Sequence, residues 1–276
     1  MRRLEQTFRS LREKGSGALV PYVCAGDPDE SFTVDLVKTL VKAGADIVEL
    51  GLPFSDPVAD GPVIQKAMQR SLSGGFRVRS IFKTISTLRS QEITTPIVVM
   101  TYYNPVLKSG VGSFCSALAE AGADGILVVD LPPEESEELD AAARANRLDI
   151  IRLVAPSTSD SRLDFILSRS SGFVYAVSVS GTTGARDVLP QTAQQLLKRI
   201  VPRSPIPVAL GFGISGPQHV RSALEAGASG VVVGSKLVSV YSEGSDERLK
   251  ILAKVETFTK ELKAATVGIK RERSRP

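Results

Sequence analysis

Two carboxylates, Glu49 and Asp60, lie on either side of one loop and could carry out acid–base chemistry. Glu49 ends an apolar run, Ile47-Val48-Glu49-Leu50, and strand alternation places Ile47 and Glu49 on the same side of the strand. If Ile47 faces the axis of a barrel, Glu49 does so too, and burial raises its pKa toward the range that a general acid or base needs. The structural alternative is a glutamate paired with a lysine or arginine at the strand end.

Asp60 precedes Gly61-Pro62, a sequence typical of the start of a helix, and by itself it would be interpreted as a helix cap. Residues 51–61 form the longest connection without periodicity, and Glu49 and Asp60 flank it. Both acids could therefore overhang one cavity and hold different charge states.

Two glycine-containing turns suggest a phosphate site. One covers residues 211–217 and contains Gly213, and the other is Gly234-Ser235-Lys236. Barrel enzymes commonly bind phosphate in the corresponding loops through backbone N–H groups and a short helix. Gly184, in the loop after the sixth predicted strand, could supply a third donor.

Other mechanisms lack the necessary residues. His219 is the only histidine, so neither a histidine-ligated metal site nor a Ser-His-Asp relay can be assembled, and no metal site is expected. A Schiff-base mechanism needs a lysine on a strand, and no predicted strand contains one. Cys24 ends a strand without a histidine partner. Acid–base catalysis remains, and the substrate must supply its own electron sink.

The elements that must position these residues alternate between short apolar runs and longer segments with helical periodicity, which is typical of repeated βαβ units. Eight strand–helix pairs predict a single-domain (β/α)₈ TIM barrel over residues 1–265, and Leu4, Phe8 and Leu11 predict an N-terminal capping helix. Residues 178–186 suit a lid, and residues 266–276 are expected to be a disordered basic tail. The predicted strands are 18–24, 46–50, 97–101, 125–129, 150–154, 174–177, 208–210 and 230–233.

Composition excludes several classes of protein. The net charge is only +4 and several basic residues lie near the two ends, so no nucleic-acid surface is expected. Two cysteines are too few for a disulfide framework. No apolar run reaches membrane-spanning length, and we expect a cytoplasmic protein without membrane contact.

The residues from Glu49 to Gln65 resemble the signature of the tryptophan synthase α subunit family, and the likeness covers nearly the whole chain except the basic tail. It continues through Pro21-Tyr22, residues 25–28, Tyr103-Asn104 and the glycine-containing segments 181–184, 211–215 and 234–235. The resemblance implies a lyase that cleaves indole-3-glycerol phosphate to indole and glyceraldehyde 3-phosphate. The indole ring would be the electron sink.

The resemblance also implies roles for individual residues. Glu49 would protonate indole C3 and take part in the side-chain proton transfers, and Asp60 would stabilise the charge that develops at the ring nitrogen. Thr183 would help close the sixth loop over Asp60. The phosphate would be held by Gly184, Gly213, Gly234 and Ser235, and the apolar slot for indole would be formed by Tyr22, Met100, Leu127, Tyr175 and Phe212.

The family works as a complex with a pyridoxal-phosphate β subunit that receives indole, which implies an α2β2 heterotetramer. Pro53 and Asp56 are the candidate partner-facing residues. No cofactor is implied for this chain itself. The sequence departs from the family pattern at Thr182, where valine is usual, and at Lys236, where a small residue is common.

Two alternatives stay open at this point. One is a regulatory barrel that keeps the ligand pocket but has lost turnover, although Glu49 and Asp60 are both present. The other is a sugar-phosphate epimerase or phosphoribosyl isomerase, which would share the glycine turns but has no reason to carry the signature from Glu49 to Gln65.

Overall fold

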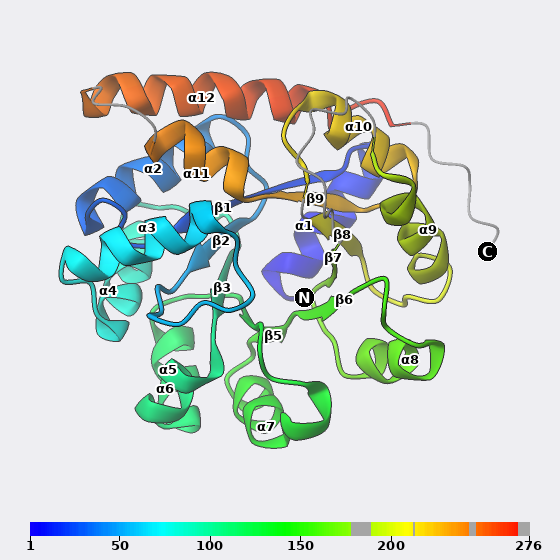
Figure 1. Cartoon of the computed structure of the whole chain (residues 1–276), viewed down its shortest axis with the longest axis horizontal. Helices are drawn as coiled ribbons and strands as arrows, with labels where there is room; N and C mark the ends of the chain where they lie inside the picture. Colours follow the sequence, from blue (N-terminus) through cyan, green and yellow to red (C-terminus); the bar gives the residue numbers. More distant parts are fainter. Residues whose placement is uncertain (178–188, 212, 243–246, 270–276) are drawn as a thin grey trace.

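The chain folds into a nearly closed barrel of parallel strands surrounded by helices, seen in a computed structural model (Figure 1). The structure describes residues 1–177, 189–211, 213–242 and 247–269. The strands follow the order β5-β4-β3-β2-β1-β9-β8-β7-β6, and all the registered pairs are parallel. The strands are β1 (Ala18–Cys24), β2 (Val48–Gly51), β3 (Ile97–Thr101), β4 (Gly125–Val128), β5 (Asp149–Ile150), β6 (Arg152–Val154), β7 (Val174–Val177), β8 (Val208–Gly211) and β9 (Gly230–Val233).

The predicted TIM barrel is confirmed, with one difference in the fifth strand. That run is divided at Ile151 into β5, which pairs with β4, and β6, which pairs with β7. The two pieces are the edges of the sheet, so the division falls where the barrel closes. The eight predicted strands therefore account for all nine observed within the described residues.

Helices cover the outside of the barrel (Figure 1). They begin with local capping signals such as Asp29, whose carboxylate accepts a hydrogen bond from Phe32 N at 2.7 Å. The helices are α1 (Arg3–Glu13), α2 (Glu30–Lys42), α3 (Pro62–Ser73), α4 (Val78–Ser90), α5 (Tyr103–Ser109), α6 (Val111–Glu120), α7 (Glu137–Ala145), α8 (Asp160–Ser168), α9 (Gln191–Ile200), α10 (Pro217–Glu225), α11 (Ser235–Ser242) and α12 (Arg248–Ala264), with a 3₁₀ turn at Pro133–Glu135.

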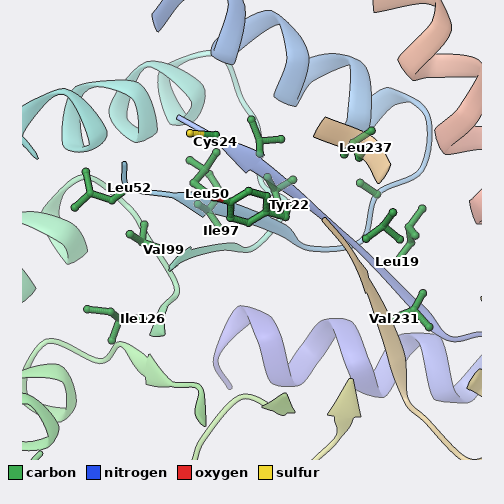
Figure 2. Packing of buried hydrophobic residues seen from close by; sticks show 14 of the residues in the cluster. Leu19, Tyr22, Cys24, Leu50, Leu52, Ile97, Val99, Ile126, Val231 and Leu237 are labelled. Atoms are coloured by element: carbon green, nitrogen blue, oxygen red, sulfur yellow. The ribbon is translucent and has the colours of Figure 1, made fainter. Parts of the chain in front are cut away.

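The barrel has an inner and an outer apolar layer, because alternate strand residues point to opposite faces. The outer layer packs strands against helices, and Figure 2 shows part of it, including Leu19, Leu50 and Leu237 of α11. The inner layer contains Ile47 and Val98 together with Leu4, Phe8 and Leu11 of α1, as predicted for a capping helix. Helix α1 thus closes one end of the barrel, and the opposite end is left for the site.

The segment expected to be a tail is packed at its start. Thr266 and Ile269 are buried, and backbone bonds from Gly17 N to Thr266 O (3.0 Å) and from Ile269 N to Gly15 O (3.3 Å) join them to the barrel. Packing therefore extends past the predicted boundary at residue 265 as far as Ile269. Residues 270–276 lie outside the described part of the chain.

Candidate active site

A cavity of 180 Å³ opens at the carboxyl ends of the strands, which we call the barrel mouth. It brings together most of the predicted site residues that the structure describes. Its lining comprises Tyr22, Glu49, Asp60, Gly61, Ile64, Met100, Tyr175, Gly213, Ile214, Ser215, Val232, Gly234, Ser235 and Lys236. A larger cavity of 1220 Å³ lies beside α1 at the other end of the barrel, but neither Glu49 nor Asp60 lines it. The chemistry therefore belongs to the smaller cavity.

Glu49 is buried at the mouth, and its carboxyl is unpaired within the part of the chain that the structure describes. As strand alternation predicted, Ile47 belongs to the inner layer, whereas Val48 and Leu50 belong to the outer layer. The Glu49 side chain lines the cavity and is only 1% exposed, and neither carboxylate oxygen has a hydrogen-bond partner within the described residues. The structural alternative, a pairing with a basic side chain, is not found there.

The environment of Glu49 favours its protonated form. Desolvation by burial raises its pKa from the ordinary value of 4.5 to about 8, and the nearby negative charge of Asp60 adds to the shift. A carboxyl group with a pKa close to neutrality can both donate and recover a proton during one reaction cycle. This is the behaviour that acid–base catalysis requires.

Asp60 lies across the same cavity in a more polar environment. The Tyr102 hydroxyl donates a hydrogen bond of 2.6 Å to Asp60 Oδ2 and accepts one of 3.1 Å from Ala59 N. Burial raises the pKa of Asp60, whereas the bond from Tyr102 lowers it. Helix α3 is capped by Gly61, so Asp60 is not the cap residue that its sequence position alone suggested.

Tyr102 is a site residue that the sequence interpretation missed. It directly follows strand β3, and its ring is buried and packs on Phe54 with ring centroids 5.3 Å apart. A tyrosine immediately after a barrel strand is placed at the mouth, and this position was the signal that could have revealed it. Three apolar residues of the lining, Ile64, Ile214 and Val232, were missed as well.

The rings of Tyr22 and Tyr175 lie at the mouth, and each packs directly against a glycine of the neighbouring strand. A side chain carbon at Gly51 would lie 2.1 Å from the Tyr22 hydroxyl oxygen, and one at Gly211 would lie 2.3 Å from the Tyr175 ring. Only glycine leaves room for these rings. Together with Met100, the two rings form part of the apolar lining of the cavity.

Another part of the cavity wall is formed by the turns that follow β8 and β9. Gly213 adopts a φ of +79°, which favours glycine, and α11 begins at Ser235 directly after Gly234. The first N–H groups of a helix are free of intrahelical partners and attract anions. The Lys236 side chain also lines this wall and is exposed, so a positive charge lies beside these groups.

The remaining predicted site residues that the structure describes do not line the cavity. Leu127 is buried in the inner layer and is absent from the cavity lining. Pro53 is buried in this chain, whereas Asp56 is exposed. Four further positions, Thr182, Thr183, Gly184 and Phe212, lie outside the described residues.

Neither a metal cluster nor a membrane helix is found in the described part of the chain. No three His, Cys, Asp or Glu side chains there are grouped in a way that could hold a metal ion. None of the helices in those segments combines the length and the apolar character needed to cross a membrane.

Fold and site together define a (β/α)₈-barrel enzyme with an acid–base pair at its mouth. The chain matches the family described as "Tryptophan synthase alpha chain" over residues 8–267. It is 44% identical to the tryptophan synthase alpha chain of Carboxydothermus hydrogenoformans, with 96% of this chain and 100% of that protein covered. It is also 44% identical to the corresponding protein of Arabidopsis thaliana, with 96% of each chain covered. The chain therefore belongs to the tryptophan synthase alpha chain family.

Solved structures agree with this assignment. The fold is similar to a structure of tryptophan synthase from Mycobacterium tuberculosis, with a TM-score of 0.87, 39% identity and coverage of 96% of this chain and 98% of the other. It also matches a chain of the tryptophan synthase complex from Pyrococcus furiosus, with a TM-score of 0.83, 41% identity and coverage of 90% and 98%.

Proposed function

We propose that this chain is the lyase that catalyses the alpha reaction of L-tryptophan biosynthesis, the retro-aldol cleavage of indole-3-glycerol phosphate. Its products would be indole and D-glyceraldehyde 3-phosphate. Family membership supports the reaction, and the observation that carries the mechanism is the buried, unpartnered carboxyl of Glu49 facing a cavity shared with Asp60. An acid with a pKa of about 8 is available to protonate a carbon at neutral pH.

In the proposed mechanism the protonated Glu49 gives its proton to C3 of the indole ring. The positive charge that develops at the ring nitrogen is stabilised by the carboxylate of Asp60, which Tyr102 holds at 2.6 Å. The bond between C3 and the first glycerol carbon then breaks, and its electrons return to the ring. The hydroxyl on that carbon becomes the aldehyde, and its proton returns to Glu49, so the enzyme is restored.

Binding at the two ends of the substrate orients it for this step. The indole slot would be formed by Tyr22, Met100 and Tyr175, with Leu127 behind them and Phe212 contributed by resemblance. The phosphate would be held by backbone groups at Gly213, Gly234 and Ser235, near the positive charge of Lys236. By resemblance alone, Gly184 would add a donor and Thr183 would act in closing the sixth loop.

We further propose that the chain works with a pyridoxal-phosphate β subunit in an α2β2 heterotetramer, and that it uses no cofactor of its own. The complex from Pyrococcus furiosus among the similar structures supports a partnered protein. Asp56 is exposed, and Val58 in the same loop is 83% exposed, so this part of the 51–61 loop is available for a partner. Pro53 is buried in this chain and would support the contact from below the loop surface. A cytoplasmic location is proposed because Cys24 and Cys115 are free thiols.

The direct test is indole release from indole-3-glycerol phosphate by the purified chain, with and without a β subunit. Glu49→Gln keeps the volume of the side chain and removes the titrating proton, so turnover should fall by about a thousandfold or more while substrate still binds. Appreciable turnover by the Glu49→Gln variant contradicts the role of Glu49. A chelator such as EDTA should leave the rate unchanged, and zinc-restored activity after chelation would favour the epimerase alternative.

A further inference from the structure

The Tyr22 hydroxyl is a buried polar group that the proposed mechanism does not use. Tyr22 is 3% exposed, and its hydroxyl has no hydrogen-bond partner within the described residues. Two other buried tyrosines do have partners: Tyr102 bonds Asp60 and Ala59, and the Tyr241 hydroxyl accepts a bond of 3.3 Å from Cys24 N. Burial of an unpaired hydroxyl costs free energy that phenylalanine would avoid. The unpaired Tyr22 hydroxyl therefore indicates that a bound ligand supplies its hydrogen-bond partner.

The position of Tyr22 limits what that ligand group can be. Tyr22 is in register with Glu49 on the neighbouring strand, and its ring extends from β1 toward β2, so its hydroxyl lies over Gly51 (Figure 2). Its Cβ atom lies on the other side, 3.9 Å from the position of a side chain carbon at Gly234. The residue thus spans the distance between the phosphate end and the acid end of the cavity.

The polar groups of the proposed substrate can be assigned by elimination. The indole ring has one polar atom, its N–H, which is the partner of Asp60. The phosphate binds at the turns that follow β8 and β9. Glu49 accepts the proton of the hydroxyl on the first glycerol carbon, so only the second hydroxyl of the glycerol chain remains without a protein partner. This chain connects the ring to the phosphate and must pass Tyr22 and Glu49.

We infer that the Tyr22 hydroxyl hydrogen-bonds a hydroxyl of the substrate's glycerol chain and makes the site selective for a hydroxylated chain. The inference rests on the function proposed above. Burial is the main cause that raises the pKa of Tyr22 well above its ordinary value, so the hydroxyl stays protonated and can donate. A buried polar group that loses its partner discriminates strongly against a ligand that lacks the matching hydroxyl.

The affinities of two ligands distinguish a hydrogen-bonding role of the Tyr22 hydroxyl from a role in packing alone. One is indole-3-glycerol phosphate, and the other is the indole propyl phosphate that lacks both glycerol hydroxyls. Dissociation constants are measured by calorimetry on the full chain with the β subunit, in a Glu49→Gln background that prevents turnover. Tyr22→Phe should raise the dissociation constant of the glycerol ligand by about tenfold. It should change the dissociation constant of the propyl ligand by no more than about twofold.

Tyr241→Phe is the matched control, because it also removes one buried tyrosine hydroxyl but lies outside the cavity lining. It should leave both dissociation constants unchanged. Equal weakening of both ligands by Tyr22→Phe, or no change in either, overturns the inference. If neither ligand binds the chain with Tyr22 intact, the proposed function itself fails, and the two failures are thereby distinguished.

Discussion

Buried carboxylates occur at both ends of the barrel, but their surroundings differ. At the amino ends of the strands, which we call the barrel base, Asp124 accepts hydrogen bonds from Arg89 at 2.7 Å, Arg3 at 2.9 Å and Ile97 N at 2.8 Å. Asp46 is similarly bound by Lys263 at 2.7 Å and by Leu19 N at 2.8 Å, and Asp149 pairs with Arg2. At the mouth, Glu49 has no hydrogen-bond partner among the described residues, and Asp60 accepts a bond from Tyr102.

This difference separates stability from function. A buried charge is tolerated where basic side chains and backbone N–H groups compensate for lost hydration, and such groups tie α1 and the strand starts together at the base. A buried carboxyl without such compensation destabilises the fold. This loss of stability is tolerated at a site where the carboxyl is needed for catalysis. The two ends of the barrel should therefore respond in opposite ways to substitution of their acids.

The largest expected effect is a gain of stability on replacing Glu49 at high pH. The native state holds a proton on Glu49 up to about pH 8, whereas the unfolded chain loses it near 4.5, so wild-type stability falls as pH rises through this window. Glu49→Gln removes that loss. Its unfolding free energy relative to wild type should therefore rise by up to about 5 kcal/mol from pH 5 to pH 9.

Urea unfolding at both pH values measures this effect. Glu134→Gln, an exposed acid paired with Arg162, is the control and should change stability equally at both pH values. Parallel stability curves for wild type and Glu49→Gln would show that Glu49 ionises normally in the folded protein.

At the base, replacement of an acid should have the opposite sign. Asp124→Ala leaves Arg89 without its carboxylate and should cost about 3 kcal/mol of unfolding free energy, while the turnover of the folded fraction stays near that of wild type. Glu134→Ala breaks an exposed pair instead and should cost less than about 1 kcal/mol. A loss of turnover without loss of stability in Asp124→Ala would contradict the division between base and mouth.

A smaller effect is expected at Tyr102. Tyr102→Phe removes the hydrogen bond that lowers the pKa of Asp60, so that pKa should rise and the carboxylate should be less ordered. The value of kcat/KM should fall by about tenfold, with a larger loss at acidic than at alkaline pH. A uniform loss across the pH profile would indicate damage to packing rather than to Asp60.

Most of the fold was predictable because its signals are local. Short apolar runs located the strands, alternation along one of these runs sent Glu49 inward, and amphipathic spacing located α1. The division of β5 from β6 at Ile151 was not predictable, since it depends on closure of the sheet. The packing of Ile269 against the base depends on contacts with Gly15, which is distant in sequence.

The site was predictable in part. Glu49 and Asp60 were found from their place around one loop, and the turns at Gly213 and Gly234 from their place after the last strands. The bond from Tyr102 to Asp60 was missed because it joins two different loops, and no sequence pattern encodes such a contact. Leu127 was expected in the indole slot only by resemblance, and it is buried in the inner layer without lining the cavity.

Burial without a basic partner among the described residues holds Glu49 as a protonated acid at neutral pH in the proposed mechanism. Carbon-13 NMR of the chain with labelled glutamate carboxyls, with the Glu49 signal assigned by its absence in Glu49→Gln, follows that ionisation directly. If Glu49 is protonated at neutral pH, this one signal has a midpoint close to pH 8. A midpoint near the ordinary value of 4.5 would contradict it.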